Sequence, residues 1–277
     1  MSTEVRTTPD PTRPVVGTHE VTQWRGGVSE WVKLRSLRST LWTLGAACVA
    51  LVGLGVLIAY VRTTQTALGT GPGPGTSDPT ATALAGVNFG QLAIGVLGVL
   101  VVTGEYSTGM IRATLTAVPR RLTVLWAKSA VFAVVTFAVS LVSVVAAFFG
   151  AQAILSRSDL QTTFGADGVA RAVVGAALYL TVVGLLGMAL GWLLRSTAGA
   201  IAALFALLLV VPVVFGLLPA SWNDTVGPYL PNNAGQAVMT VAGDGSLLPP
   251  WTGFAVFCGY AALVLVAGAV RLVRRDA

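Results

Sequence analysis

Six long runs of mostly apolar residues dominate this sequence, and they leave few folds open. Each has about the 20 residues that a helix needs to cross roughly 30 Å of hydrocarbon. Each must be helical, because unpaired backbone groups are too costly in lipid; a β-barrel would need short alternating segments, and these runs do not alternate. The sequence therefore predicts an all-α, polytopic membrane protein. The six runs are Leu41–Val61, Leu84–Thr103, Leu125–Ile154, Ala170–Leu194, Ala200–Leu218 and Trp251–Leu272.

The placement of lysine and arginine predicts the orientation of these spans. Fourteen of the 17 basic residues fall before the first span, between spans two and three, after span four or after span six. Arg62, Arg157 and Arg171 are the other three. Basic residues concentrate on the cytoplasmic side of membrane proteins, so both termini are predicted to be cytoplasmic. The net charge of +6 reflects this asymmetry toward the bilayer and does not indicate a nucleic-acid partner.

Outside the spans, the chain divides into a tail and one membrane domain. Residues 1–20 have scattered charge and no hydrophobic period, which predicts a disordered cytoplasmic tail; residues 21–277 form the six-span domain. From about residue 24 to 40, apolar residues recur at three- and four-residue steps with basic residues between them. This pattern predicts an amphipathic helix at the inner membrane surface. The residues of this helix that we expect at the membrane surface are Trp31, Lys33, Arg35 and Arg38.

The remaining outer and intramembrane features predict local packing. The outer loop at about 219–250 is moderately apolar, which predicts short helices that re-enter the membrane. Gly184, Gly187 and Gly191 form a small-residue stripe on span four. Packing within the chain is favoured for this stripe over a dimer seam. Pro212 is predicted to kink span five.

Asn88 and Gln91 lie three residues apart on one face of span two. Buried amides in a membrane most often bond to neighbouring helices. Lining a transport pathway is the second interpretation.

A charged segment between spans two and three has the pattern of a short amphipathic helix at about 105–119. Ile111, Leu115, Val118 and Leu122 make one apolar stripe, and Glu105 stands at the expected N-terminal end, where its charge favours the helix dipole. Ser107 or Thr108 is the expected cap, and Pro119 ends the helix. A stiff element held between two spans at the cytoplasmic face can transmit force from a soluble partner.

This segment, Gly104-Glu-Tyr-Ser-Thr-Gly-Met-Ile-Arg-Ala-Thr-Leu-Thr-Ala-Val-Pro-Arg-Arg121, resembles the link between spans two and three of type-2 ABC exporter permeases. Residues 29–42 are similar to their amphipathic elbow, and Tyr229-Leu-Pro-Asn-Asn-Ala-Gly235 and the C-terminal Arg-Arg-Asp-Ala resemble actinobacterial members. The similarity covers roughly residues 20–277.

The resemblance implies a permease subunit that pairs with a second permease subunit, the same or related, and with two copies of an ABC ATPase. ATP and Mg would bind that partner; this chain has no Walker A sequence and is expected to bind no cofactor, to hold no metal site and to be no enzyme. The elbow and the coupling helix would contact the ATPase in a bacterial plasma membrane. The coupling residues implied by motif position are Glu105, Tyr106, Gly109, Ile111, Arg112, Leu115, Pro119, Arg120 and Arg121.

Two other function classes stay open from the residues alone: an ion-coupled carrier, and a permease-like sensor or signalling protein without its own ATPase. An ion-coupled carrier usually places ionisable groups near the membrane midplane, and the six runs hold none there. An intramembrane enzyme is disfavoured, because the single histidine, His19, lies in the tail and no pair of carboxylates lies in a span.

Overall fold

The computed structural model of the chain describes residues 38–70, 78–110, 121–241 and 247–274. All regular structure in these ranges is helical, and six helical stretches are long and apolar enough to cross a membrane. The prediction of an all-α, six-span membrane protein is confirmed. The amphipathic helix expected at 24–40 lies almost wholly outside the described residues.

Four of the six spans are single helices, and two are broken. The single helices are α2 (Arg38–Ala67), α6 (Arg121–Leu155), α7 (Val169–Leu194) and α12 (Pro250–Arg274). Span two consists of α3 (Pro79–Leu84) and α4 (Val87–Ser107). Between them lies Gly86, where an added Cβ would stand 2.0 Å from the carbonyl oxygen of Leu51 in α2. The break therefore coincides with a contact between two backbones that only glycine allows.

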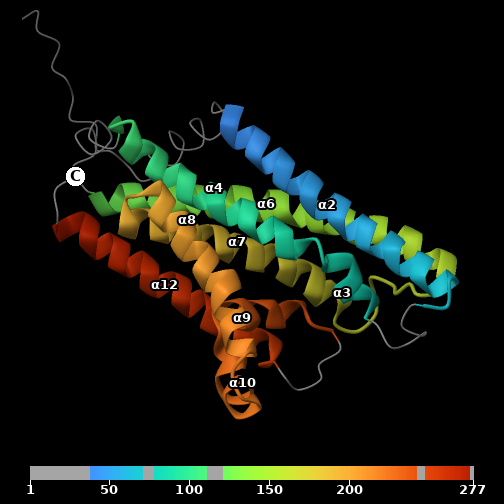
Figure 1. Cartoon of the computed structure of the whole chain (residues 1–277). Coiled ribbons are helices and arrows are strands. Elements are labelled where there is room, and N and C mark those ends of the chain that lie inside the picture. The colour runs from blue at the N-terminus through green and yellow to red at the C-terminus, as the bar shows by residue number, and fades with distance from the viewer. Residues whose placement is uncertain (1–37, 71–77, 111–120, 242–246, 275–277) are drawn as a thin grey trace, which may run out of the picture.

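Span five is irregular one turn before its proline. It consists of α8 (Thr197–Phe205), the π-helical turn η2 (Ala206–Val210) and α9 (Val211–Gly216), which has Pro212 in its first turn. Proline has no N–H to donate to the preceding turn, and a π-turn is one way in which a helix accommodates such a gap. The kink predicted at Pro212 stays a prediction, and the structure shows a π-helical turn just before this residue. Figure 1 shows α9 and the following α10 (Ala220–Val226) leaving the rest of the bundle.

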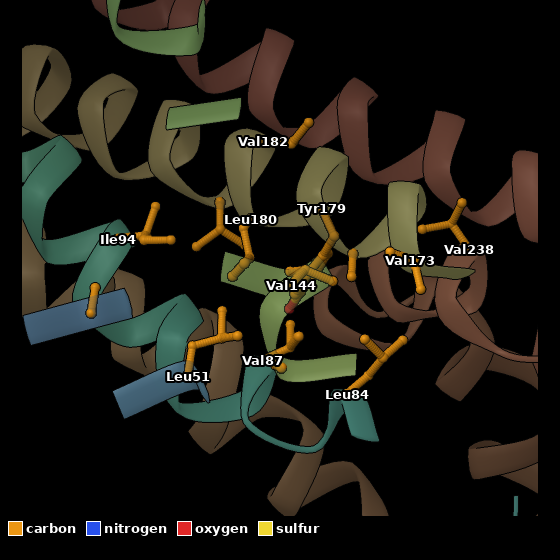
Figure 2. Packing of buried hydrophobic residues seen from close by; sticks show 14 of the residues in the cluster. Leu51, Leu84, Val87, Ile94, Val144, Val173, Tyr179, Leu180, Val182 and Val238 are labelled. Atoms are coloured by element: carbon orange, nitrogen blue, oxygen red, sulfur yellow. The ribbon is translucent and has the colours of Figure 1, made fainter. Parts of the chain in front are cut away.

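Helix α7 is the centre of the bundle (Figure 1). It contacts α4, α6, α8 and α12, and 83% of its most apolar stretch is buried, against 17% for span five. Its large buried side chains include Tyr179, Leu186 and Trp192. Figure 2 shows Tyr179 and Leu180 of α7 among core side chains from α2, α4 and α6. Helix α7 is also rich in glycine, and small residues of this kind let the backbones of neighbouring helices approach closely.

The glycine stripe of α7 faces α4 within the same chain. An added Cβ at Gly187 would lie 2.2 Å from the carbonyl oxygen of Gly95, and one at Gly98 would lie 2.0 Å from that of Gly184. At Gly191 the nearest atom would be Val102 Cβ, at 3.2 Å. The interpretation of the stripe as packing inside the subunit is confirmed.

The two ends of the bundle differ in chemistry. At one end, called here the basic end, the chain leaves α4, α7 and α12 and enters α6 and α8. This end carries Lys128, Arg195, Arg271 and Arg274. At the other, called here the loop end, α7 and α12 begin. The short helices there are α10, η3 (Gly227–Tyr229), α11 (Pro231–Gln236) and η4 (Ala237–Met239). The short helices expected in the outer loop at 219–250 are therefore present.

Candidate functional site

The last turn of α4 lies beyond Thr103, where span two was predicted to end. The end of span two is therefore corrected to Ser107. Glu105, Tyr106 and Ser107 lie in α4, and Thr108 is its C-cap. Gly109 follows with φ +71°, the left-handed geometry in which glycine commonly ends helices. Met110 is helical again, so the predicted coupling helix is not continuous from Glu105.

The hydroxyls expected to cap that helix point the other way along the chain. Ser107 Oγ and Thr108 Oγ1 both donate to the carbonyl oxygen of Gly104, at 3.0 and 2.8 Å. Both bond to one carbonyl oxygen in the last turn of α4, as hydroxyl side chains often do in helices. They are therefore not N-caps of a helix that starts at Glu105. The predicted helix started at Glu105 because a carboxylate suits a helix N-terminus, whereas the apolar stripe begins only at Ile111.

Glu105 and Lys128 form a buried ion pair between α4 and α6. Lys128 Nζ lies 2.7 Å from Glu105 Oε1, and the two side chains are 4% and 11% exposed. Lys128 stands about two turns into α6, so its side chain is shielded by neighbouring helices. A charge that is this buried needs a partner, because its transfer from water is costly. The pair therefore fixes the end of α4 to α6.

Tyr106, the next residue, contacts a different helix from Glu105. Successive residues on a helix point about 100° apart, so Tyr106 meets α7 while Glu105 meets α6. Its ring packs edge-on against Trp192, with centroids 6.0 Å apart. The guanidinium carbon of Arg195 lies 5.4 Å from the Tyr106 ring centroid. This is a cation–π geometry at the turn between α7 and α8.

Arg195 and Arg271 extend this contact to α12. Arg271 Nη1 donates to the carbonyl oxygen of Leu193 in the last turn of α7, and Arg195 Nη2 donates to the carbonyl oxygen of Arg271, at 3.4 Å. A cation at a helix C-terminus is favoured by the helix dipole and by the unpaired carbonyls there. Thr197 Oγ1 also donates to Thr103 Oγ1, at 2.9 Å, which joins α8 to α4.

We call these side chains the basic-end network. They link the ends of α4, α6, α7, α8 and α12 around the residues that precede Gly109. The members are Thr103, Glu105, Tyr106, Lys128, Trp192, Arg195, Thr197 and Arg271.

The network contains two of the predicted coupling residues, Glu105 and Tyr106. Gly109 lies just beyond them at the break. Ile111, Arg112, Leu115, Pro119 and Arg120 lie outside the described residues, and Arg121 is known only as the first residue of α6. Trp31, Lys33 and Arg35 of the elbow also lie outside them, and Arg38 is known only as the start of α2.

Trp192 and Arg195 were not predicted from the sequence as partners of this site. A tryptophan and an arginine at the end of an apolar run are typical of a membrane interface, so nothing in the pattern distinguishes them. Only the packing of α7 against α4 places them beside Tyr106.

Arg271→Gln should destabilise the protein by about 1.5–3 kcal/mol, because it removes a charge-assisted bond to the end of α7. Arg274→Gln, one turn further and exposed, is the matched control and should change stability by less than about 0.5 kcal/mol. Thermal unfolding of both purified variants in one detergent measures the difference. Equal losses would show that Arg271 does not support α7.

At the loop end, Asn88 and Gln91 belong to a second polar cluster. Gln91 is buried and accepts a hydrogen bond from the hydroxyl of Tyr179 in α7. Asn88 is exposed, and its Oδ1 accepts from Gln236 Nε2 of α11 at 2.9 Å. Both amides therefore bond to neighbouring elements, as the first interpretation expected. Tyr179, Asn232 and Gln236 were not identified from the sequence as partners of these two amides.

The Asp, Glu, Lys and Arg side chains of the described spans lie toward the span ends, as Glu105, Lys128 and Arg171 do. Among the described residues, no group of three or more His, Cys, Asp and Glu side chains could hold a metal ion. The chemistry that these sites offer is hydrogen bonding and charge pairing between helices.

No protein-family model matches the chain. No curated protein matches it either. The resemblance to type-2 ABC exporter permeases therefore rests on the residues quoted from the sequence and stays a prediction.

Proposed function

We propose that the chain is the membrane-spanning subunit of an ATP-driven exporter, with ATP and Mg bound by a separate ATPase chain. The observation that carries the proposal is the basic-end network. Of two adjacent residues, Glu105 connects the end of span two to α6, and Tyr106 connects it to α7 and, through Arg195, to α12. The segment that follows Gly109 is the one that resembles the coupling segment of exporter permeases.

The network gives this segment a mechanical connection to most of the bundle. A push on the chain after Gly109 reaches α4 first, and the buried ion pair and the Tyr106 contacts carry it to three further spans. Interior packing transmits such displacements because it is dense and yields little. An ATPase subunit that closes on ATP could thus move several spans together.

The proposed topology places the basic end at the cytoplasmic face of a bacterial plasma membrane. A second permease subunit would complete the pathway, and two ATPase subunits would bind below. The charge distribution supports this orientation. In the described spans, no Asp, Glu, Lys, Arg or His lies at mid-depth, which favours an ATP-driven subunit over an ion-coupled carrier.

The test is a mild-detergent pull-down of the tagged chain from its native membrane, comparing Arg112→Glu with the unaltered chain. We expect the unaltered chain to retain a P-loop ATPase in stoichiometric amount. The variant should retain about tenfold less or lower still, because reversing a charge at an interface creates like-charge repulsion. Mass spectrometry and quantitative immunoblotting measure both proteins.

Arg157→Glu is the matched control, since Arg157 is exposed in η1 (Ser156–Ser158) at the loop end. It makes the same charge reversal on the side away from the ATPase and should leave recovery unchanged. Equal recovery with Arg112→Glu would remove Arg112 from the coupling role. Recovery of the chain alone, even after crosslinking, would favour the sensor or carrier interpretation.

A further inference from the structure

The segment Pro231–Thr240, called here the plug, is packed into the bundle at the loop end. Helices α11 and η4 contact both α7 and α12, and Ala234, Ala237 and Val238 are at most 1% exposed. Figure 2 shows Val238 among the buried side chains of the core. An added Cβ at Gly235 would lie 2.5 Å from the Tyr179 ring. The plug thus fits flat against α7.

The plug reaches well below the start of the spans. Asn232 Oδ1 lies 2.9 Å from the hydroxyl oxygen of Tyr179. Tyr179 is ten residues after Val169, the first residue of α7, which corresponds to roughly 15 Å along a helix. That distance is about half of a hydrocarbon layer of roughly 30 Å. The plug and its polar side chains therefore lie at the depth of the membrane-spanning helices.

One end of the plug is held by uncharged groups, which we call the latch. Tyr179 lies within hydrogen-bond distance of both Gln91 and Asn232. Gln236 Nε2 donates to Asn232 Oδ1 at 3.0 Å and to Asn88 Oδ1 at 2.9 Å. The latch therefore joins α11 to α4 and α7 through one phenol and four amides.

The other end is held by a charge, which we call the anchor. Arg171 Nη1 donates to the carbonyl oxygen of Val238 at 3.0 Å, and its Nη2 donates to that of Thr240 at 2.9 Å. Hydrogen bonds to charged groups are roughly twice as strong as neutral ones. Neutral side-chain bonds between membrane helices are weak on average. The two ends of one short segment thus differ in how readily they release.

We propose that the plug is a gate at the loop end: α11 releases from α4 and α7 by breaking the latch, while the Arg171 anchor keeps the η4 end in place. The latch groups that release would leave Gln91, Asn88 and the Tyr179 hydroxyl facing the opened space. Such groups suit water or a polar ligand, whereas the rest of the neighbouring core is apolar. The gate needs no ATPase and applies equally to an exporter, a carrier or a sensor.

The test compares thiol labelling of the plug in purified protein in lipid nanodiscs, where both membrane faces are accessible. The native Cys48 and Cys258 are replaced by alanine. One reporter, Ala234→Cys, lies at the latch end, and a second, Val238→Cys, lies at the anchor end. In each background, Tyr179→Phe removes the hydroxyl and keeps the ring that packs on Gly235. A charged, membrane-impermeant thiol reagent then reports exposure.

We expect Tyr179→Phe to raise the labelling rate at residue 234 about tenfold, since it removes the hydroxyl that hydrogen-bonds within the latch. The rate at residue 238 should change little. Thr181→Val is the matched control: it removes another buried hydroxyl of α7, which donates to the carbonyl oxygen of Ala177 at 2.7 Å and takes no part in the latch. That control should leave both rates unchanged.

Two results would overturn the gate. Equal labelling at residue 234 with and without the Tyr179 hydroxyl would show that the latch does not hold the plug. Equal acceleration at residues 234 and 238 would show that the segment has no anchored end. If a cysteine reporter does not fold, amide hydrogen exchange of residues 231–240 in Tyr179→Phe and Thr181→Val decides the same question in chains that keep Ala234 and Val238. Because the assay contains no ATPase, its outcome is independent of the pull-down.

Discussion

Replacing Gly98 by alanine is expected to prevent α4 from packing on α7 and to leave little folded protein. The added methyl carbon would lie 2.0 Å from the carbonyl oxygen of Gly184, and backbone cannot move aside as a side chain can. Alanine favours a helix over glycine by about 1 kcal/mol, but relieving the clash should cost about 3 kcal/mol or more. The steric clash therefore outweighs the gain in helix propensity, and the variant is expected to be less stable. Reaction of Cys48 and Cys258 with a fluorescent thiol dye during heating measures unfolding.

Gly53→Ala in α2 and Gly259→Ala in α12 are the controls, because an added Cβ at either position meets nothing within 4 Å. Both should keep or slightly raise the unfolding temperature. Gly187→Ala should repeat the damage from the other side of the contact, where Gly95 O would lie 2.2 Å away. A Gly98→Ala protein as stable as the controls would contradict the close approach of α4 and α7.

Lys128→Met is expected to cost about 3–5 kcal/mol of stability, because it removes the ammonium group that pairs with the buried Glu105 carboxylate. Methionine keeps the length and much of the volume of lysine, so the loss should come from charge and not from a cavity. The end of α4 would then no longer be fixed to α6. Thermal unfolding in detergent measures the loss.

The double variant Glu105→Gln/Lys128→Met removes both charges and tests this reason. It should recover most of the stability that either single change loses, because replacing a buried pair together is often close to neutral. The interaction energy of the cycle then isolates the contribution of the pair. Additive losses in the double variant would mean that the two side chains stabilise the protein separately.

The apolar runs of the sequence were sufficient to predict six membrane-spanning helices. Hydrocarbon forces every backbone group to pair within its own segment, so length and composition settle where a span lies before any packing is known. The glycines at 184, 187 and 191 also indicated a close helix contact. Their spacing named the face of α7, but it did not name α4 as the helix that meets it.

The period of a helix did not reveal where one helix stops. The apolar stripe lies after Gly109, and Glu105 was added to its helix because a carboxylate suits a helix N-terminus, so the sequence predicted a coupling helix from Glu105. The structure ends α4 before Gly109, because φ of +71° there breaks the path of the chain. As a result, Glu105 and Tyr106 stabilise the bundle from within span two.

What the sequence determined by itself is therefore local: the number of spans, the ends that carry positive charge and the positions of small residues. What only the tertiary structure decided is which side chains meet, such as Glu105 with Lys128 and Tyr179 with Asn232. The physical reason is that burial in lipid acts on each segment separately, as a property of its own composition. Hydrogen bonds and ion pairs between helices act across separations of 23 and 53 residues here, and they depend on how the helices are packed.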